Sequence, residues 1–279
     1  MLQLGIRLHD MQAGTLAERA ALAREQGFSC VHLALSKTIP DFPMEPAAFT
    51  TGLGKHIRNI FAAEGIDIAV LGCYYNLAHP DPLKVKKLQR LYVAHLRMAR
   101  TLGCSVVGTE TGAPNAEYQY DPTCHTETAL QSFLRGVVPI VEAAERLGVI
   151  LAIEPVWNHI VWKPQVARRV IHEIASPNLR IILDPVNLLS IENYEQRDMV
   201  IGEALDILGE YVEVVHLKDF RVEEGKLVSV AAGTGLMDYR EIMAYLKQSK
   251  PFVQATLENT VPENAVRARE YLAGIYAEA

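Results

Sequence analysis

The segment VILAIE at residues 149–154 is a short apolar run that ends in a carboxylate. The second half of the chain contains three more runs of this kind, RIILD at 180–184, VEVVH at 212–216 and FVQATLE at 252–258. The polar residues that close the four runs are Glu154, Asp184, His216 and Glu258. They follow one another at intervals of roughly 30 to 40 residues, about the length of one βα unit. This spacing predicts parallel strands that are linked by helices.

Strand-like apolar runs alternate with stretches of helical periodicity along the whole chain, and several helical stretches end at a glycine. The predicted strands are Leu4–His9, Cys30–Leu35, Ile66–Leu71, Ser105–Gly108, Val149–Ile153, Leu179–Leu183, Tyr211–Leu217 and Phe252–Leu257. The predicted helices are Thr15–Gln26, Pro46–Glu64, Asp81–Leu102, Thr126–Leu147, Pro164–Ala175, Gln196–Leu208, Asp238–Gln248 and Pro262–Ala277. Eight alternations predict a parallel sheet with right-handed crossovers. Because the first and last strands both end in candidate site residues, we expect closure into a (β/α)8 TIM barrel, with residues 1–279 as a single domain.

The composition is that of a soluble enzyme with a large core, with 49% hydrophobic and 22% charged residues. A net charge of −6 lacks the basic footprint of a nucleic-acid binder. No signal-peptide pattern opens the sequence, and no uncharged apolar run approaches the roughly 18 residues of a membrane span. The four cysteines show no C-x-x-C spacing, which disfavours a disulfide framework or a zinc ribbon. We expect a cytoplasmic protein that binds neither nucleic acid nor membrane.

The four polar strand ends predict a metal site. In a parallel barrel, the C-terminal ends of the strands converge on one mouth, where active sites lie. Three carboxylates and one imidazole at that mouth would form a divalent metal site of hard oxygen ligands with one nitrogen. Any one of them alone is as readily an ordinary polar residue at a strand end. All four in register favour the metal site.

Four segments resemble the xylose-isomerase-like barrel superfamily of sugar isomerases, epimerases and dehydratases. They are AIEP at 152–155, ILDPVN at 182–187, VHLKD at 215–219 and LEN at 257–259, and the glycine-flanked turn at 232–239 is a looser match. The first half of the chain matches this superfamily only in layout. The resemblance implies that Glu154, Asp184, His216 and Glu258 bind one divalent ion, Mn2+, Mg2+ or Co2+.

The resemblance also implies an activity, with Glu154 and Glu258 as an acid/base pair on opposite sides of the metal site. A divalent ion that grips a carbonyl and its neighbouring hydroxyl stabilises an enediolate. A carboxylate on each face of that plane can remove a proton and return one. The implied protein is a metal-dependent sugar or polyol isomerase or epimerase, with a small-molecule sugar or keto-polyol as substrate. Assembly into a homo-oligomer stays open.

Further residues are candidates for contacts with the substrate. Asn187 stands where many relatives have a histidine that contacts substrate, and its amide can donate a hydrogen bond but cannot shuttle protons. This departs from the pattern of the ketose epimerases. Lys218 and Arg221 could hold a polyol oxygen, a carboxylate or a phosphate. The remaining candidates are Trp157, whose ring suits the C–H side of a sugar, His159 and Glu110.

Two other polar residues receive supporting roles. Asp219, which follows the predicted ligand His216 by three positions, is expected to orient a ligand rather than to bind metal. His32 lies inside the second predicted strand and is assigned to the core. Gly233 and Gly235 lack the spacing of a P-loop or of a dinucleotide fingerprint, so a tight turn is expected there.

Three alternative functions share parts of this evidence. A lyase on the same fold, such as an inosose or dehydroshikimate-like dehydratase or a 3-keto-glycoside eliminase, begins with the same proton abstraction, so the ligands do not separate it from an epimerase. A hydrolase resembling the endonuclease four branch needs several metals and a DNA-binding surface, which the acidic net charge disfavours. A sugar-binding protein on a decayed barrel would have lost a ligand, and none of the four is missing.

Overall fold

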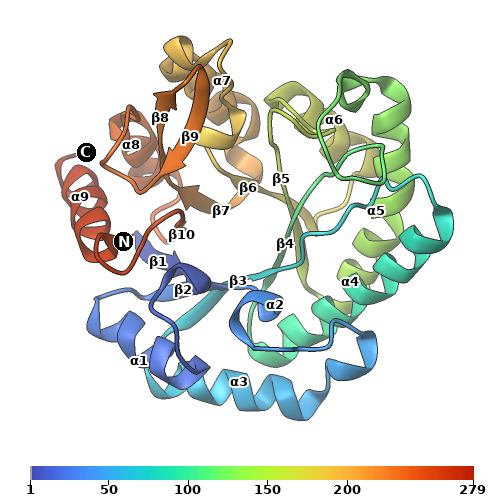
Figure 1. Ribbon diagram of the computed structural model, residues 1–279, viewed down its shortest axis with the longest axis horizontal. Helices are drawn as coiled ribbons and strands as arrows, with labels where there is room; N and C mark the ends of the chain where they lie inside the picture. The colour runs from blue at the N-terminus through green and yellow to red at the C-terminus, as the bar shows by residue number, and fades with distance from the viewer. Residues whose placement is uncertain (1) are drawn as a thin grey trace.

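Eight parallel strands close into a barrel in the computed structural model, which describes residues 2–279 (Figure 1). The barrel strands are β1 (Gln3–Arg7), β2 (Cys30–Leu33), β3 (Asp67–Gly72), β4 (Val106–Glu110), β5 (Ile150–Glu154), β6 (Leu179–Leu183), β7 (Val212–Leu217) and β10 (Gln254–Leu257). They follow one another around the barrel in chain order, and β10 pairs with β1 to close it. The predicted (β/α)8 architecture is confirmed.

The barrel is surrounded by helices that return the chain from the end of one strand to the start of the next (Figure 1). The long helices are α1 (Leu16–Glu25), α3 (Thr51–Ala63), α4 (Pro82–Leu102), α5 (Glu127–Leu147), α6 (Pro164–Ile174), α7 (Arg197–Leu208), α8 (Arg240–Ser249) and α9 (Ala265–Glu278). Their ends follow local rules. Thr15 and Glu18 form a capping box at the start of α1. Gly103 and Gly148, which end α4 and α5, take the left-handed conformation with φ of 79° and 64°.

The structure differs from the predicted elements mainly after β7. Residues 218–237, predicted as a loop, contain an antiparallel hairpin of β8 (Asp219–Glu223) and β9 (Lys226–Val230), shown in orange beside the barrel mouth in Figure 1. The two residues between these strands, Glu224 and Gly225, both have positive φ, as a two-residue hairpin turn requires. The first two strands are also shorter than predicted, because a 3-10 turn (Leu8–Asp10) and the short helix α2 (Leu35–Thr38) follow them.

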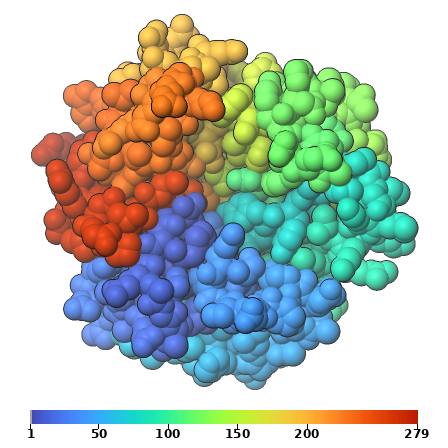
Figure 2. Space-filling model, viewed as in Figure 1, coloured from blue at the N-terminus to red at the C-terminus, as the bar shows by residue number. Residues whose placement is uncertain are grey.

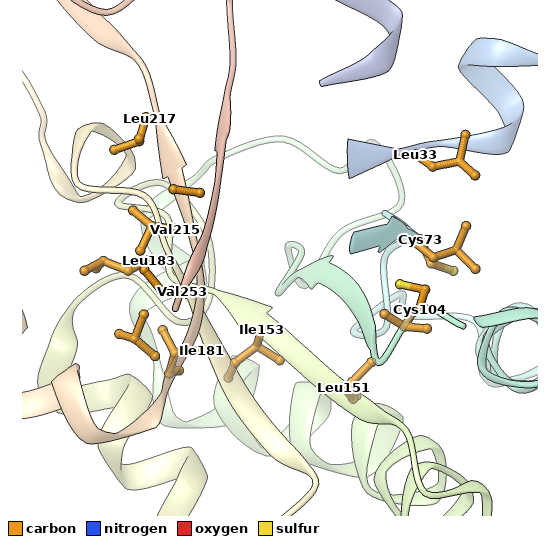
Figure 3. Close-up of a cluster of buried hydrophobic side chains, with 14 of the residues drawn as sticks. Leu33, Cys73, Cys104, Leu151, Ile153, Ile181, Leu183, Val215, Leu217 and Val253 are labelled. Carbon is orange, nitrogen blue, oxygen red and sulfur yellow. The ribbon is translucent and has the colours of Figure 1, made fainter. Parts of the chain in front are cut away.

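The strands separate two apolar layers. Along β5, Leu151 and Ile153 belong to the large cluster between the strands and the helices, part of which Figure 3 shows. Ala152 lies between them in sequence and packs inside the barrel with residues of other strands. This alternation is the two-residue period of a pleated strand. It fixes which residue at the end of each strand faces the interior.

The cysteines and the helices bear on the compartment and membrane predictions. All four cysteines are buried free thiols. Within residues 2–279, no helix combines the length and the apolar character that crossing a membrane requires.

We predict opposite effects of alanine at two helical glycines. At Gly136 in α5, a Cβ atom would lie 2.1 Å from the carbonyl oxygen of Leu77, so Gly136→Ala should lower the free energy of unfolding by about 1–3 kcal/mol. At Gly274 in α9, a Cβ atom would meet nothing within 4 Å, so Gly274→Ala should raise it by about 0.5–1 kcal/mol. Denaturant unfolding of both variants checks this, and equal effects would contradict the close contact at Gly136.

Candidate metal centre

The four predicted ligands occupy one layer at the mouth of the barrel. Interior positions of β5, β6 and β7 are marked by three residues that pack together inside the barrel, Ala152, Ile182 and Val214. Side chains alternate along a strand, so the residues two positions further on also face the interior. These residues are Glu154, Asp184 and His216. Glu258, which directly follows β10, completes the layer.

The four side chains meet around the imidazole of His216. Its Nδ1 atom lies 3.3 Å from Glu154 Oε2 and 3.3 Å from Glu258 Oε1. Donor atoms of Glu154, Asp184 and His216 all lie within 4.8 Å of one another. Each of the four residues is buried, with at most 6% of its surface exposed. The structure therefore brings together residues that the sequence spreads over about a hundred positions.

The donor set fits a hard divalent ion. Both ring nitrogens of His216 are buried, and neither makes a hydrogen bond of good geometry with any residue in 2–279. The Nδ1 atom faces two carboxylate oxygens without a hydrogen bond to either. This is the arrangement expected of ligand atoms that surround one shared ion. Oxygen-rich sets with one imidazole suit Mg2+ and Mn2+, and Co2+ accepts the same donors.

The cluster carries an excess of buried negative charge, which shows in the raised pKa values of His216 and Asp184. Burial lowers the pKa of His216, but the carboxylates of Glu258 and Glu154 more than offset this and raise it to about 9. The pKa of Asp184 is raised to about 6, chiefly by burial, and the carboxylates of Glu154 and Glu258 add to the shift. Buried carboxylates that crowd together need cations beside them, because they have lost the solvation of water.

Lys218 supplies one such cation from within the chain. Its Nζ atom lies 2.8 Å from Asp184 Oδ2 and 3.6 Å from Glu258 Oε2, and only 5% of the residue is exposed. Burial lowers its pKa, but the carboxylate of Asp184 outweighs burial, so the pKa is raised and the ammonium stays charged. The predicted substrate-binding residue thus lies inside the acidic cluster itself.

Asn187 positions the carboxylate of Glu154. Its side-chain amide donates a hydrogen bond of 2.6 Å to Glu154 Oε1. The backbone N–H groups of Val186 and Asn187 donate to Asp184 Oδ1, which fixes the 3-10 turn after β6. The amide of Asn187 is therefore turned toward a predicted ligand.

Two residues beside this layer, Arg7 and His32, make contacts that the sequence did not predict. Arg7 ends β1, and its Nη1 atom lies 3.2 Å from Glu258 Oε2 while Asp10 holds its Nε atom at 3.0 Å. His32 is buried, as the core assignment required, but its contacts are with the site. Its Nδ1 atom lies 3.7 Å from Glu258 Oε1, and its ring stacks on His216 at 5.2 Å between centroids. The predicted strand Leu4–His9 placed Arg7 inside the strand, so its position at the end of β1 was not apparent from the sequence.

The sequence profile of the xylose isomerase-like TIM barrel matches residues 20–274. The chain belongs to the xylose isomerase-like TIM barrel family. A comparison with curated proteins found no match.

Solved structures agree with the family at the level of the fold. A D-psicose 3-epimerase from Clostridium cellulolyticum H10, solved with D-tagatose, is 17% identical with a TM-score of 0.73 and covers 98% of this chain and 99% of its own. A probable 3-DHS dehydratase involved in petrobactin synthesis, from Bacillus anthracis, is 14% identical with a TM-score of 0.74 and covers 99% of both chains. A xylose isomerase-like TIM barrel protein from Mycobacterium smegmatis, in complex with magnesium, is 17% identical with a TM-score of 0.71 and covers 98% of this chain and 94% of its own.

In this family member two of the four predicted ligands, Glu154 and Glu258, line a cavity of about 350 Å³, the mouth cavity. Figure 2 shows the surface hollowed near its centre, where segments from both halves of the chain meet. The cavity wall includes Arg7, His32, Tyr74, Glu110, Glu154 and Glu258. Tyr118 donates a hydrogen bond of 3.0 Å to Glu110 Oε2. Burial, with the neighbouring charge of Glu154, raises the pKa of Glu110 to about 7.

The other predicted substrate contacts lie outside the lining of the mouth cavity within residues 2–279. His159 lies behind Glu110, with its Nδ1 atom 3.8 Å from Glu110 Oε2. Trp157 packs on Tyr120 at 5.3 Å between ring centroids. Arg221 is exposed on β8 and donates a hydrogen bond of 2.7 Å to the carbonyl of Thr234.

Asp219 organises the glycine turn rather than a ligand, in contrast to its expected role. Its carboxylate accepts hydrogen bonds from four backbone N–H groups, at 2.8 Å from Phe220, 3.1 Å from Gly233, 2.8 Å from Gly235 and 2.8 Å from Met237. One side chain thereby folds the segment after β9 back onto the start of β8. The tight turn expected at these glycines is present.

Proposed function

We propose that the protein is a divalent-metal-dependent sugar or polyol isomerase or epimerase in which Glu154 and Glu258 transfer a proton. The observation that carries this proposal is the pair of buried carboxylates at equal distances of 3.3 Å from one imidazole nitrogen. They come from β5 and from the end of β10, so they approach the mouth cavity from different sides. Membership of a family with similarly folded epimerases supports the same reaction class.

Glu154, Asp184, His216 and Glu258 would hold one Mn2+, Mg2+ or Co2+ ion. When bound, the ion supplies Lewis-acid polarisation of a substrate carbonyl and compensates the charge of the enediolate. The ammonium of Lys218 and the guanidinium of Arg7 add fixed positive charge on the Glu258 side. These cations help the carboxylates of Glu154 and Glu258 to stay anionic although both are buried.

Proton transfer falls to the two glutamates. Burial raises the pKa of Glu258, but His216 and Lys218 outweigh it and hold the pKa well below its usual range. The pKa of Glu154 is also lowered, against burial, chiefly by His216. Each group therefore begins as a carboxylate able to accept a proton from the carbon next to a carbonyl. The C–H electron pair forms the C=C bond of an enediolate while the carbonyl π pair moves onto oxygen. A proton returned to the same carbon from the opposite face gives the epimer. A proton added to the former carbonyl carbon, with loss of the proton of the neighbouring hydroxyl, gives the isomer.

A lyase acting by the same first step is the second candidate, and Glu110 is the observation that favours it. This third carboxyl group lines the mouth cavity, and its raised pKa of about 7 keeps a proton available near neutrality. A protonated carboxyl group can donate to a departing hydroxyl or alkoxide. The fold is also shared with a probable 3-DHS dehydratase.

We expect the purified protein to bind about one divalent ion per chain. Asp184→Asn or Glu154→Gln should weaken Mn2+ binding by more than about 100-fold. Loss of a direct ligand costs more binding free energy than loss of a residue that only contacts a ligand. Glu110→Gln is the matched control, since it makes the same kind of acid-to-amide change in the wall of the mouth cavity, outside the four predicted ligands. Calorimetric titration with Mn2+ measures all three. Full binding by the two ligand variants would refute the ligand assignment.

Glu258→Gln should lower turnover by at least about 100-fold while the substrate still binds, because the variant loses a general acid–base group. Turnover is measured on the substrate found by screening free ketoses and keto-polyols with the metal-loaded protein. An unchanged turnover number would remove Glu258 from proton transfer.

Turnover in deuterated water should place deuterium on the carbon that exchanges its proton with a glutamate, in the product and in recovered substrate. A partly solvated carboxylate exchanges the abstracted proton before returning it, which a sugar-binding protein cannot do. Mass spectrometry and proton NMR locate the label. Direct transfer of label between neighbouring carbons would favour a hydride shift, and an absorbing enone product would assign the protein to the lyases.

A further inference from the structure

A second cavity, the side cavity, lies directly beside the mouth cavity and has a volume of about 340 Å³. Two residues, Met44 and Tyr75, line both cavities, so they form the partition between them. Five apolar residues line most of the side cavity, and His79, Lys84 and Lys87 complete its wall. The apolar residues are Met44, Pro46, Tyr75, Leu88 and Leu91. The polar mouth cavity thus has an apolar neighbour of similar size.

The wall of the side cavity is built from two parts of the chain held against each other. Leu88 and Leu91 lie on α4, and Pro46 lies in the 3-10 turn Pro46–Ala48 between α2 and α3. Phe49, at the end of that turn, packs on His95 of α4 at 4.5 Å between ring centroids. Glu45 and Lys87 form an ion pair of 3.4 Å across the rim. These contacts join the two parts of the wall.

His79 contributes a buried donor to the same wall. Its Nδ1 atom accepts a hydrogen bond of 2.9 Å from the backbone N–H of Asp81, so the ring hydrogen is on Nε2. The Nε2 atom is buried and has no hydrogen-bond partner in residues 2–279. Because this nitrogen is buried, it is shielded from a ligand in the cavity, and the ring of His79 contributes packing surface to the wall.

We propose that the side cavity binds an apolar, ring-sized substituent of the substrate. The substrate would then be a substituted keto-sugar, such as an aryl keto-glycoside, rather than a free monosaccharide, since the proposed reaction needs a carbonyl group at the metal quartet. This inference rests on the proposed function, because the polyol part lies at the metal quartet in the mouth cavity.

The chemistry of the two cavities separates these substrate classes. A free sugar carries an oxygen on nearly every carbon, so it gains little from a wall of five apolar side chains. An aromatic or branched substituent gains roughly 25 cal/mol for each Å² that it buries there. Met44 is the flexible member of the partition, since an unbranched thioether adapts to a ligand that passes it.

Phenol is the probe for the side cavity, because it combines one ring with one oxygen and needs neither metal nor proton transfer. In the full-length protein with 13C-labelled methionine methyl groups, we expect saturable shifts of the Met44 signal. Leu88→Trp, which fills the cavity, should weaken phenol binding at least tenfold. Leu83→Trp is the matched control, since Leu83 lies on the same helix with 77% of its surface exposed. Binding by Leu88→Trp equal to that of wild type, or no Met44 shift, would overturn the assignment.

The link to the substrate is tested with matched methyl and phenyl keto-glycosides of several hexoses, titrated into the metal-loaded protein. At least one phenyl glycoside should bind ten times more tightly than its methyl partner, and Leu88→Trp should remove that difference. Phenyl glycosides that bind no better in any pair would overturn the proposal. Loss of the metal-binding or deuterium result with phenol binding intact would instead count against the proposed function alone.

Discussion

The mouth of this barrel depends on one electrostatic constraint, the burial of three carboxylates within reach of a single imidazole. Glu154, Asp184 and Glu258 have each lost most of the solvation of water, and isolated buried charges of this kind are strongly unfavourable. Two cations of the chain lie beside these carboxylates. Lys218 contacts Asp184 and Glu258, and Arg7 contacts Glu258. A divalent ion at the proposed site would add two further positive charges. The site is thus an anionic pocket that its own cations only partly neutralise.

The barrel supplies this arrangement through the pleat of its strands. Interior positions recur every second residue, so small and apolar residues inside the barrel are followed by the polar layer at the mouth. The strands without a charged group also shape the cavity. A Cβ atom at Gly72 would lie 2.6 Å from His32 Nε2, so glycine at this position of β3 lets the imidazole occupy the floor. Because Gly72 at the end of β3 has no side chain, there is room for the imidazole of His32.

The two halves of the chain contribute different parts of the site. Strands β5 to β10 carry the quartet, the Asn187 contact and the turn organised by Asp219, which are the segments that resemble the family. The first half supplies Arg7 and His32 behind Glu258, and the wall shared by the mouth and side cavities. In the proposed function, proton transfer therefore falls to residues of the second half. In the proposed side cavity, residues of the first half contact the substituent of the substrate.

The sequence by itself determined the alternation of strands and helices, the closed barrel and the four residues that end β5, β6, β7 and β10. Apolar periodicity and strand-end polar residues such as Glu154 are local patterns, and parallel closure places such residues at one mouth. Only the tertiary structure decided that His32 stacks on His216, that Asp219 serves the backbone, and that Met44 and Tyr75 separate two cavities. Those contacts join segments far apart in the chain, so they depend on strand register and helix packing that no local pattern contains.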